Sequence, residues 1–262
     1  MKNSFVYRYI FIIYFSFIFI NFAQAQEQFN FDVTEIEILN KGNLFKGLKR
    51  GTISTNNGIS IQADTFTYNK VTNIVDAEGK VKVEDTAEDY FIKSDKLSYF
   101  RNIHKISTKG FTETNIENKY KTESEDLTYY LDKKEFSSRK KSTIIDDNNQ
   151  IYVLDEFIYY KNTSLLKGKN VLTITNHNLP NSDKFYFLDG IFDLKNKSFT
   201  ASDTKISIHK NIFDRNENDP RIYGVSSKSE DNKTIINKGI FTTCQKREGC
   251  PPWSIKSQKI EH

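Results

Sequence analysis

Proline is scarce in this chain and falls late in it. The 262 residues include 4 prolines, and all of them lie at or beyond Pro180. Because proline cannot donate a hydrogen bond to a strand ladder, this distribution permits uninterrupted sheet from about residue 33 to 175. Apolar stripes with helical spacing are also missing after the first 25 residues. Aromatic residues at 14% and abundant Ile, Val and Thr therefore favour an all-β fold.

An excess of charge of one sign is lacking as well. Lys and Arg number 38 and Asp and Glu number 34, which gives a formal net charge of +4. Residues 1–25 contain two of the basic residues and none of the acids, so the remainder carries 36 − 34 = +2. A nucleic-acid partner requires a strong basic excess gathered in a patch or stripe. We therefore expect no nucleic-acid partner.

Candidate catalytic and metal-binding groups are few. The 4 histidines are His104, His177, His209 and His262, and none stands in a dyad or triad context. A metal ion would need several acids or histidines that converge on one point, and no such group is visible in the sequence. We expect no enzyme activity, no metal site and no cofactor.

The first 25 residues have the composition of a targeting segment. Lys2 and Arg8 make the start positive, an apolar stretch follows over 9–22, and Ala23 and Ala25 give the small-x-small pattern of a cleavage site. The alternative is an uncleaved membrane anchor, which needs about 20 apolar residues. We expect a signal peptide over 1–25 and an exported protein.

A repeat is the most informative feature that the chain does have. An acid is followed two residues later by a large apolar residue, then by Tyr, and seven residues later by another apolar residue. The pattern occurs four times, at intervals of 31, 30 and 30 residues. The acids are Asp64, Asp95, Glu125 and Asp155; the apolar residues are Phe66, Leu97, Leu127 and Phe157; the tyrosines are Tyr68, Tyr99, Tyr129 and Tyr159; the last residues are Val75, Ile106, Phe136 and Leu166. A fixed period indicates one supersecondary unit stacked on copies of itself.

Each unit has the pattern of a β-hairpin. Apolar or small residues alternate at period two before the acid, and the phase then slips by one residue, which is typical of a β-bulge. Polar clusters such as 69–70 and 161–162 come after the tyrosines and predict turns. We expect the acids to accept backbone N–H groups at the bulges. Phe192 and Phe199 keep the seven-residue spacing, which predicts a fifth, degenerate hairpin.

Two sequence features resemble a known family. The units have the form Ala63-Asp64-x-Phe66-x-Tyr68, followed by Ala77-x-Gly79-x-Val81, and the segment 241–260 contains Cys-Pro-Pro-Trp. Both resemble the organic-solvent-tolerance (OstA-like) family, and within it the LptD subfamily of outer-membrane lipopolysaccharide-assembly proteins. The resemblance implies an open, stacked antiparallel β-jellyroll, or β-taco, over 26–240. It further implies that 241–262 leads to an outer-membrane barrel with a lipoprotein plug, a barrel that these 262 residues do not contain.

The resemblance also implies a function, namely lipopolysaccharide transport at the periplasmic face of the outer membrane. A trough inside the jellyroll would receive the acyl chains of lipid A from a periplasmic bridge protein. Each acyl methylene left in water costs about 0.8 kcal/mol, so such a lipid needs a continuous apolar path. The predicted trough residues are Ile61, Phe66, Ile92, Leu97, Leu127, Tyr152, Leu154 and Phe157. From the residues alone, an ordinary closed core is the favoured interpretation of the same apolar face, and the resemblance reverses that preference.

The expected partners are a bridge protein and the disulfide partners of two cysteines. The first strand, near 33–39, is expected to be an exposed edge that binds the bridge protein by strand addition. Cys244 and Cys250 are disulfide candidates in an exported chain. They could close a local loop, or they could pair with distant partners, as the resemblance implies. Alternative functions are a free-standing lipopolysaccharide bridge protein and a secreted β-solenoid that is structural or acts on polysaccharide.

Overall fold

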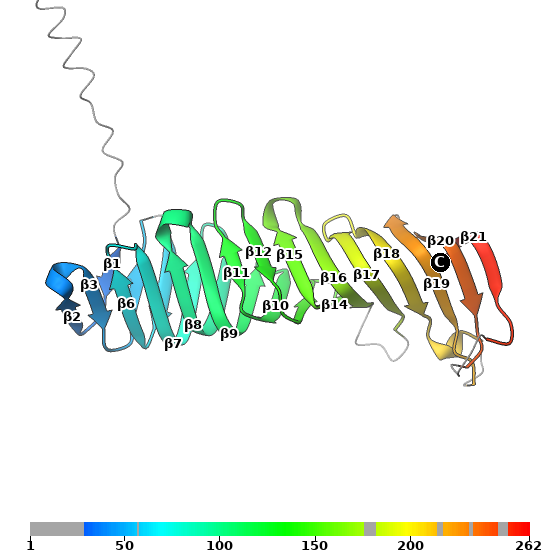
Figure 1. Cartoon of the computed structure of the whole chain (residues 1–262), viewed down its shortest axis with the longest axis horizontal. Coiled ribbons are helices and arrows are strands. Elements are labelled where there is room, and N and C mark those ends of the chain that lie inside the picture. The colour runs from blue at the N-terminus through cyan, green and yellow to red at the C-terminus, as the bar shows by residue number, and fades with distance from the viewer. Residues whose placement is uncertain (1–28, 57, 176–181, 214–216, 231–232, 246–250) are drawn as a thin grey trace, which may run out of the picture.

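The chain forms an elongated stack of antiparallel strands that run across its long axis (Figure 1). The computed structural model describes residues 29–56, 58–175, 182–213, 217–230, 233–245 and 251–262. The predicted signal peptide lies outside these residues. The strands are β1 (Asn30–Asp32), β2 (Ile36–Leu39), β3 (Leu44–Gly47), β4 (Gly51–Ser54), β5 (Ile59–Ala63), β6 (Thr65–Asn69), β7 (Ile74–Asp85), β8 (Tyr90–Phe100), β9 (Lys105–Ile116), β10 (Tyr120–Glu125), β11 (Thr128–Tyr130), β12 (Glu135–Ser138), β13 (Ser142–Ile145), β14 (Ile151–Leu154), β15 (Glu156–Tyr160), β16 (Leu165–Ile174), β17 (Lys184–Asp193), β18 (Ser198–Ser207), β19 (Arg221–Glu230), β20 (Lys233–Thr242) and β21 (Ile255–Glu261). Short 3₁₀ turns are η1 (Asn40–Gly42), η2 (Arg101–Ile103), η3 (Lys161–Thr163) and η4 (Lys210–Phe213).

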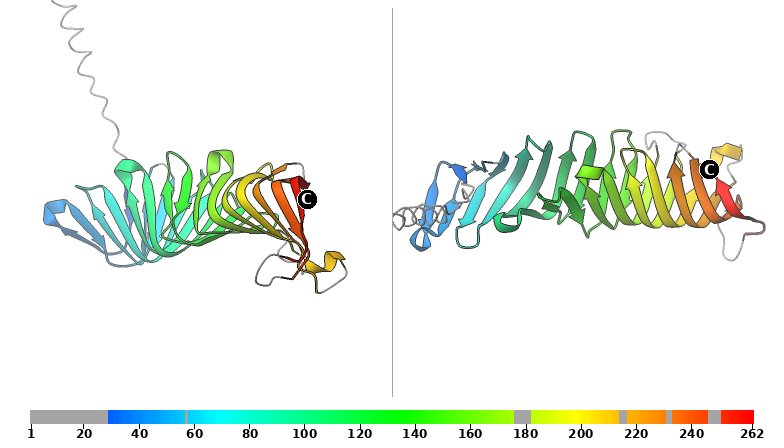
Figure 2. Two further views of the ribbon diagram at one scale, coloured as in Figure 1. Left: turned by 45° about the vertical axis from the view of Figure 1, so that its right-hand side comes forward. Right: turned by 90° about the horizontal axis from the view of Figure 1, so that it is seen from above.

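Each long strand bends at a crease, and its two halves belong to two different arms of the stack. Residues 74–78 of β7 pair with β6, whereas residues 82–85 pair with β5. The register between β7 and β8 shifts between Glu78 and Val81, where the chain passes from one arm to the other. We call the arm that contains the repeat tyrosines arm A and the opposite arm B. Figure 2 shows how the strands wrap around the long axis of the stack.

The hairpin repeat is confirmed in the strand register. Each repeat tyrosine lies one residue before the end of its strand and is the direct cross-strand partner of the apolar residue seven positions later. The pairs are Tyr68 with Val75, Tyr99 with Ile106, Tyr129 with Phe136, and Tyr159 with Leu166. The degenerate fifth unit obeys the same rule, because Phe192 pairs with Phe199 between β17 and β18. The all-β, stacked antiparallel jellyroll fold is therefore confirmed.

The repeat acids lie at the crease, but their partners differ from those expected. The register between β8 and β9 shifts between Ser94 and Lys96, on either side of Asp95. Arg50 donates to Asp64 at 2.8 Å, and Asn170 donates to Asp155 at 2.9 Å. Side-chain donors thus take the place of the backbone groups predicted at these two carboxylates.

A backbone donor does reach a carboxylate at the crease, one residue after the third repeat acid. The N–H of Gly110 donates to Asp126 at 3.0 Å.

Gly79 has a φ of +79°, and a Cβ there would meet the Asp64 carboxyl at 2.7 Å. The crease thus needs a residue without a side chain at this point.

In the middle of the stack the arms are joined by short linkers instead of continuous strands. Arm B contains β10, β13 and β14, and arm A contains β11, β12 and β15. These six strands lie between β9 and β16, which cross the crease and pair with both groups, so the eight strands form a closed ring of pairings.

The ends of the stack are strand edges. Within the described residues, β2 pairs with β3, β1 with β4, and β21 with β20. Residues 241–262 contribute the end of β20 and all of β21 to the same stack. The edge strand expected near 33–39 is β2, but it begins at Ile36 and is the second strand, because β1 precedes it.

Candidate functional site

The interior between the arms is lined by two continuous rows of side chains. In an antiparallel ladder, directly paired residues share one face, so the register defines each row. The arm B row is Phe31, Ile53, Ile61, Val83, Ile92, Thr114, Thr122, Ile144, Tyr152, Thr173, Phe185, Ile206, Ile222, Phe241 and Ile255. The arm A row is Ile38, Phe45, Tyr68, Val75, Tyr99, Ile106, Tyr129, Phe136, Tyr159, Leu166, Phe192 and Phe199. The arm B row spans the stack from β1 to β21, whereas the arm A row runs from β2 to β18, where the next partner of Phe199 is Ser229.

All eight predicted trough residues lie in this interior, and all are buried. Their exposed fractions range from 0% for Ile61, Ile92 and Leu154 to 5% for Tyr152. They belong to one continuous cluster of buried apolar residues. The protein's own side chains therefore fill the interior in this structure. Their role as lipid-binding residues stays a prediction.

Aromatic rings close the interior along its mouth, which is the side where the turns of the two arms approach each other. Tyr90 of arm B lies edge-on to Tyr129 of arm A, with ring centroids 4.9 Å apart. Tyr120 meets Tyr159 at 5.4 Å, and Tyr152 meets Phe192 at 5.4 Å. Burial is the first cause that raises the pKa of Tyr90, Tyr129 and Tyr159 above the ordinary value, so these rings stay neutral.

Tyr90 and Tyr120, the arm B partners of these rings, were not predicted from the sequence. The two residues are themselves 30 positions apart, at the period of the repeat, and this spacing could have identified them. The Tyr90 hydroxyl is buried without a hydrogen-bond partner among the described residues. A buried polar group without a partner costs free energy, so this position is a point of weakness in the core.

Charged and polar contacts cross the mouth outside the aromatic rings. The ammonium of Lys134 lies 2.8 Å from the Glu88 carboxylate, and that of Lys161 lies 3.1 Å from it. Lys161 also lies 3.4 Å from Glu117. A hydrogen bond from Lys134 lowers the pKa of Glu88, against the opposing effect of burial. These contacts join arm B turns to arm A turns.

Two further contacts cross the mouth nearer the C-terminal end. Lys197 donates to the Asn148 side chain at 3.1 Å. The ring of His262 lies 3.4 Å from Asp183, which also accepts from His209. Burial acts to raise the pKa of Asp183, but hydrogen bonds from His262 and His209 outweigh it and lower the pKa to about 2. The carboxylate is therefore ionised at neutral pH.

Hydroxyl groups interrupt the apolar interior near the crease. The hydroxyls of Thr108 and Thr112 lie 2.7 Å apart, and those of Ser124 and Ser142 lie 2.9 Å apart. All four residues are buried. Because these hydroxyls bond to each other, the interior tolerates them without water. The alternation expected from the sequence allowed small residues on this face, but it did not predict that their hydroxyls pair.

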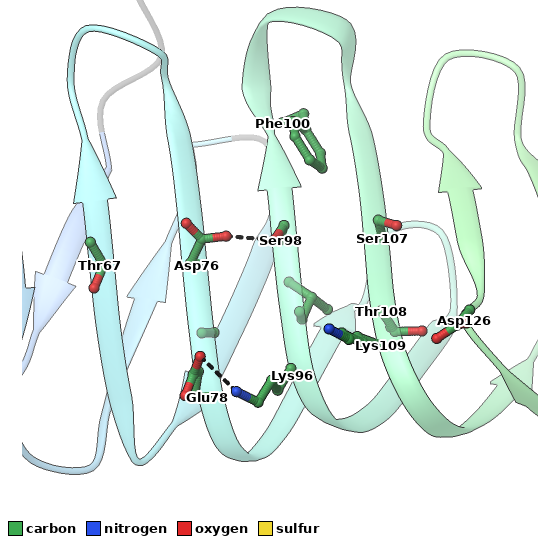
Figure 3. A pocket seen from close by; sticks show the side chains of 12 residues that line it. Thr67, Asp76, Glu78, Lys96, Ser98, Phe100, Ser107, Thr108, Lys109 and Asp126 are labelled. Carbon is green, nitrogen blue, oxygen red and sulfur yellow. Dashed lines mark hydrogen bonds and ion pairs between the residues drawn. The ribbon is translucent and has the colours of Figure 1, made fainter.

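A separate hollow of about 720 Å³ lies along arm A over β6 to β9 (Figure 3). Polar and charged residues dominate its lining, and Ser98 donates to Asp76 while Lys96 pairs with Glu78 within it. The described residues contain no group of three or more His, Cys, Asp or Glu side chains arranged to hold a metal ion. This hollow therefore offers polar contacts, and the described residues around it do not form a metal centre.

The cysteine segment is only partly described. Cys244 is half-buried near β21, and its sulfur lies 3.8 Å from the Trp253 carbonyl. Cys250 lies outside the described residues. Neither the local nor the long-range disulfide is tested, and both stay predictions.

No protein-family model matches the chain, and no curated protein is similar enough to it to count as a relative. Among the residues that the structure describes, no helix has the length and apolar character needed to cross a membrane. The function is therefore inferred from the fold and the interior.

Proposed function

We propose that this protein carries lipopolysaccharide at the periplasmic face of the outer membrane, with the acyl chains of lipid A between its two arms. The observation that carries the proposal is the continuity of the interior rows. The arm B row runs from β1 to β21 and the arm A row from β2 to β18, and no further layer covers the end strands within the described residues. Apolar side chains are exposed at these ends: Ile36 is 43% exposed, Ile38 60% and Ile255 57%. Such ends suit a path that continues into neighbouring molecules.

The physical basis is the cost of moving acyl chains through water. Each methylene in water costs about 0.8 kcal/mol, so a multi-chain lipid needs apolar contact at every step. Rows of mostly apolar side chains along the stack supply that contact in the direction of travel. Because these side chains are packed against each other, a lipid has to part the arms and replace contacts between them.

Photo-crosslinking tests the proposal. A photo-reactive amino acid at position 66, 97 or 157 should crosslink to lipopolysaccharide in cells, because these side chains face the interior. The same group at Lys70 or Lys133, on the turns, should not. The measurement is the shift of the crosslinked band detected with an antibody to lipopolysaccharide. Equal crosslinking at interior and turn positions, or none at either, would contradict the carrier function.

A structural stack that carries nothing is the second candidate. The full burial of the predicted trough residues favours it, because a closed core needs no ligand. Such a protein would show no crosslinking at interior positions. Among carriers, an outer-membrane component would also need the barrel and the lipoprotein plug that the OstA-like resemblance implies, whereas a free-standing bridge protein would need neither.

We further propose that the bridge protein binds β2 by strand addition. Leu48 donates its N–H to the Glu35 carbonyl at 3.1 Å. In the register that pairs Ile38 with Phe45, the N–H of Ile38 therefore points away from β3 and is open to another strand. The N–H of the preceding residue, Glu37, points the opposite way, toward β3.

Replacing Ile38 with proline tests this contact. The I38P variant loses the outward donor and places a ring in the path of the added strand. Its affinity for an OstA-like bridge protein from the same organism should therefore fall about tenfold or more, which is a loss of about 1.4 kcal/mol in binding free energy. I38A is the matched control, because it loses the side chain and keeps the donor. Biolayer interferometry measures the affinity of each variant for the bridge protein. Equal affinities for I38P and I38A would place the docking site elsewhere.

A further inference from the structure

Four charged side chains from distant parts of the sequence meet across the mouth. Glu88 lies in the β7–β8 turn and Glu117 in the β9–β10 turn, both on arm B. Lys134 lies in the β11–β12 turn and Lys161 in η3, both on arm A. Glu88 and Lys161 are 73 residues apart in the chain and 3.1 Å apart in space. We call these four residues the clasp.

The clasp differs from an ordinary surface ion pair. The Lys161 side chain is only 10% exposed and contacts two carboxylates, and Glu88 contacts two ammonium groups. Networks of this kind hold their geometry better than isolated exposed pairs, which contribute little. The contacts of Tyr90 with Tyr129 and of Tyr120 with Tyr159 lie near them, since the charge of Glu88 acts on the first pair of rings and that of Glu117 on the second. Polar and aromatic layers thus close the mouth at the same place.

The arm A side of the clasp lies beside the split strands. Lys134 lies in the turn between the split strands β11 and β12, and Lys161 in the turn between β15 and β16. Glu88 and Glu117 lie in turns of β7, β8 and β9, which cross the crease as continuous strands. Parting the arms here bends the short linkers and the continuous strands at the crease, and it breaks no strand pairing within either arm. The buried Tyr90 hydroxyl, which has no hydrogen-bond partner among the described residues, would regain one when the mouth opens.

We propose that the clasp is a gate through which an anionic amphiphile reaches the interior. When the arms part, its acyl chains take the place of the aromatic contacts. Lys134 and Lys161 lose their carboxylate partners and are left at the rim, where their ammonium groups bind the anionic headgroup. This inference rests on the proposed carrier function and adds the place of access and the headgroup contacts.

The test compares E88Q and E88K with the wild-type chain. E88Q removes the shared carboxylate, and E88K adds repulsion toward Lys134 and Lys161. E78Q is the matched control, because Glu78 makes an exposed 3.1 Å ion pair with Lys96 within arm A and away from the mouth. One readout is the distance between spin labels at T86C and K133C, on opposite sides of the mouth, in a chain whose natural cysteines are serine. The other is the rate at which a phosphatidic acid with a pyrene-labelled acyl chain binds.

We expect the spin-label distances to lengthen and spread in E88Q and more so in E88K, and to stay unchanged in E78Q. Binding of the labelled phosphatidic acid should become about threefold to tenfold faster in E88Q, as expected from the loss of a partly buried, charge-assisted contact. The double variant K134Q/K161Q should also open, but should lose any preference for phosphatidic acid over a diacylglycerol with the same labelled chain.

The outcomes separate the gate from the carrier function. Unchanged distances in E88K would overturn the gate, whether or not the lipid binds. Lipid binding at the same rate in wild type and E88K would also overturn the gate, while the carrier function would stand. Longer distances without lipid binding by any variant would overturn the carrier function and, with it, the gate's role in lipid access.

Discussion

Replacing Leu97 with aspartate should destabilise the fold by about 3–5 kcal/mol, because it buries a carboxylate without a partner. Leu97 is 2% exposed, and its cross-strand neighbours are Ala77 and Thr108. Neither neighbour supplies a positive charge. Unfolding in urea, followed by far-ultraviolet circular dichroism, measures the change in the free energy of unfolding.

Two control variants show whether the loss of stability in L97D comes from the buried charge. L97M keeps volume and apolarity and should cost less than about 1.5 kcal/mol. K121D introduces the same charge at an exposed site of β10 and should change stability by no more than about 0.5 kcal/mol. If L97D were as stable as K121D, water would have to fill the space between the arms. The interior would then be an open trough without any ligand.

The strand pairing could be predicted from the sequence because the repeat encodes it directly. A tyrosine and an apolar residue seven positions later become cross-strand partners when a turn of constant length separates them, as for Tyr129 and Phe136. The one-residue phase slip predicted a bulge, and the register shift at Asp95 confirms it. Local spacing was sufficient for both features.

The contacts between the arms could not be predicted in the same way. Alternation shows which side chains share a face, but it does not show how closely two faces approach each other. Glu88 and Lys161 are ordinary turn residues in the sequence, and their contact depends on the curvature of the whole stack. The same limit applies to Leu97, because its place in the alternation does not show whether its face lines an open trough or a closed core.

The hydrogen-bond partners of the residues at the crease could also not be predicted from the sequence. Asp64 has the spacing of a bulge acid, but its carboxylate accepts from Arg50, which reaches it from the β3–β4 connection. Thr108 and Thr112 are polar interruptions in the sequence, yet they are buried because their hydroxyls bond to each other. In both cases the partner lies on a different strand or across a bend, where no fixed spacing identifies it.

Replacing Tyr129 with alanine should cost about 3–5 kcal/mol of stability, the range for losing a large buried ring. Tyr129 stacks on Phe136 with centroids 3.9 Å apart and meets the edge of Tyr90 at 4.9 Å, so its removal leaves a cavity where the two arms touch. Y129F keeps the ring and should stay within about 1 kcal/mol of the wild type. Y90F removes the buried hydroxyl that has no described partner, and should be neutral or stabilising. Urea unfolding of the three variants gives the comparison. A small loss in Y129A would mean that the arms do not depend on their aromatic contacts, and the mouth would then be held by the charged residues alone.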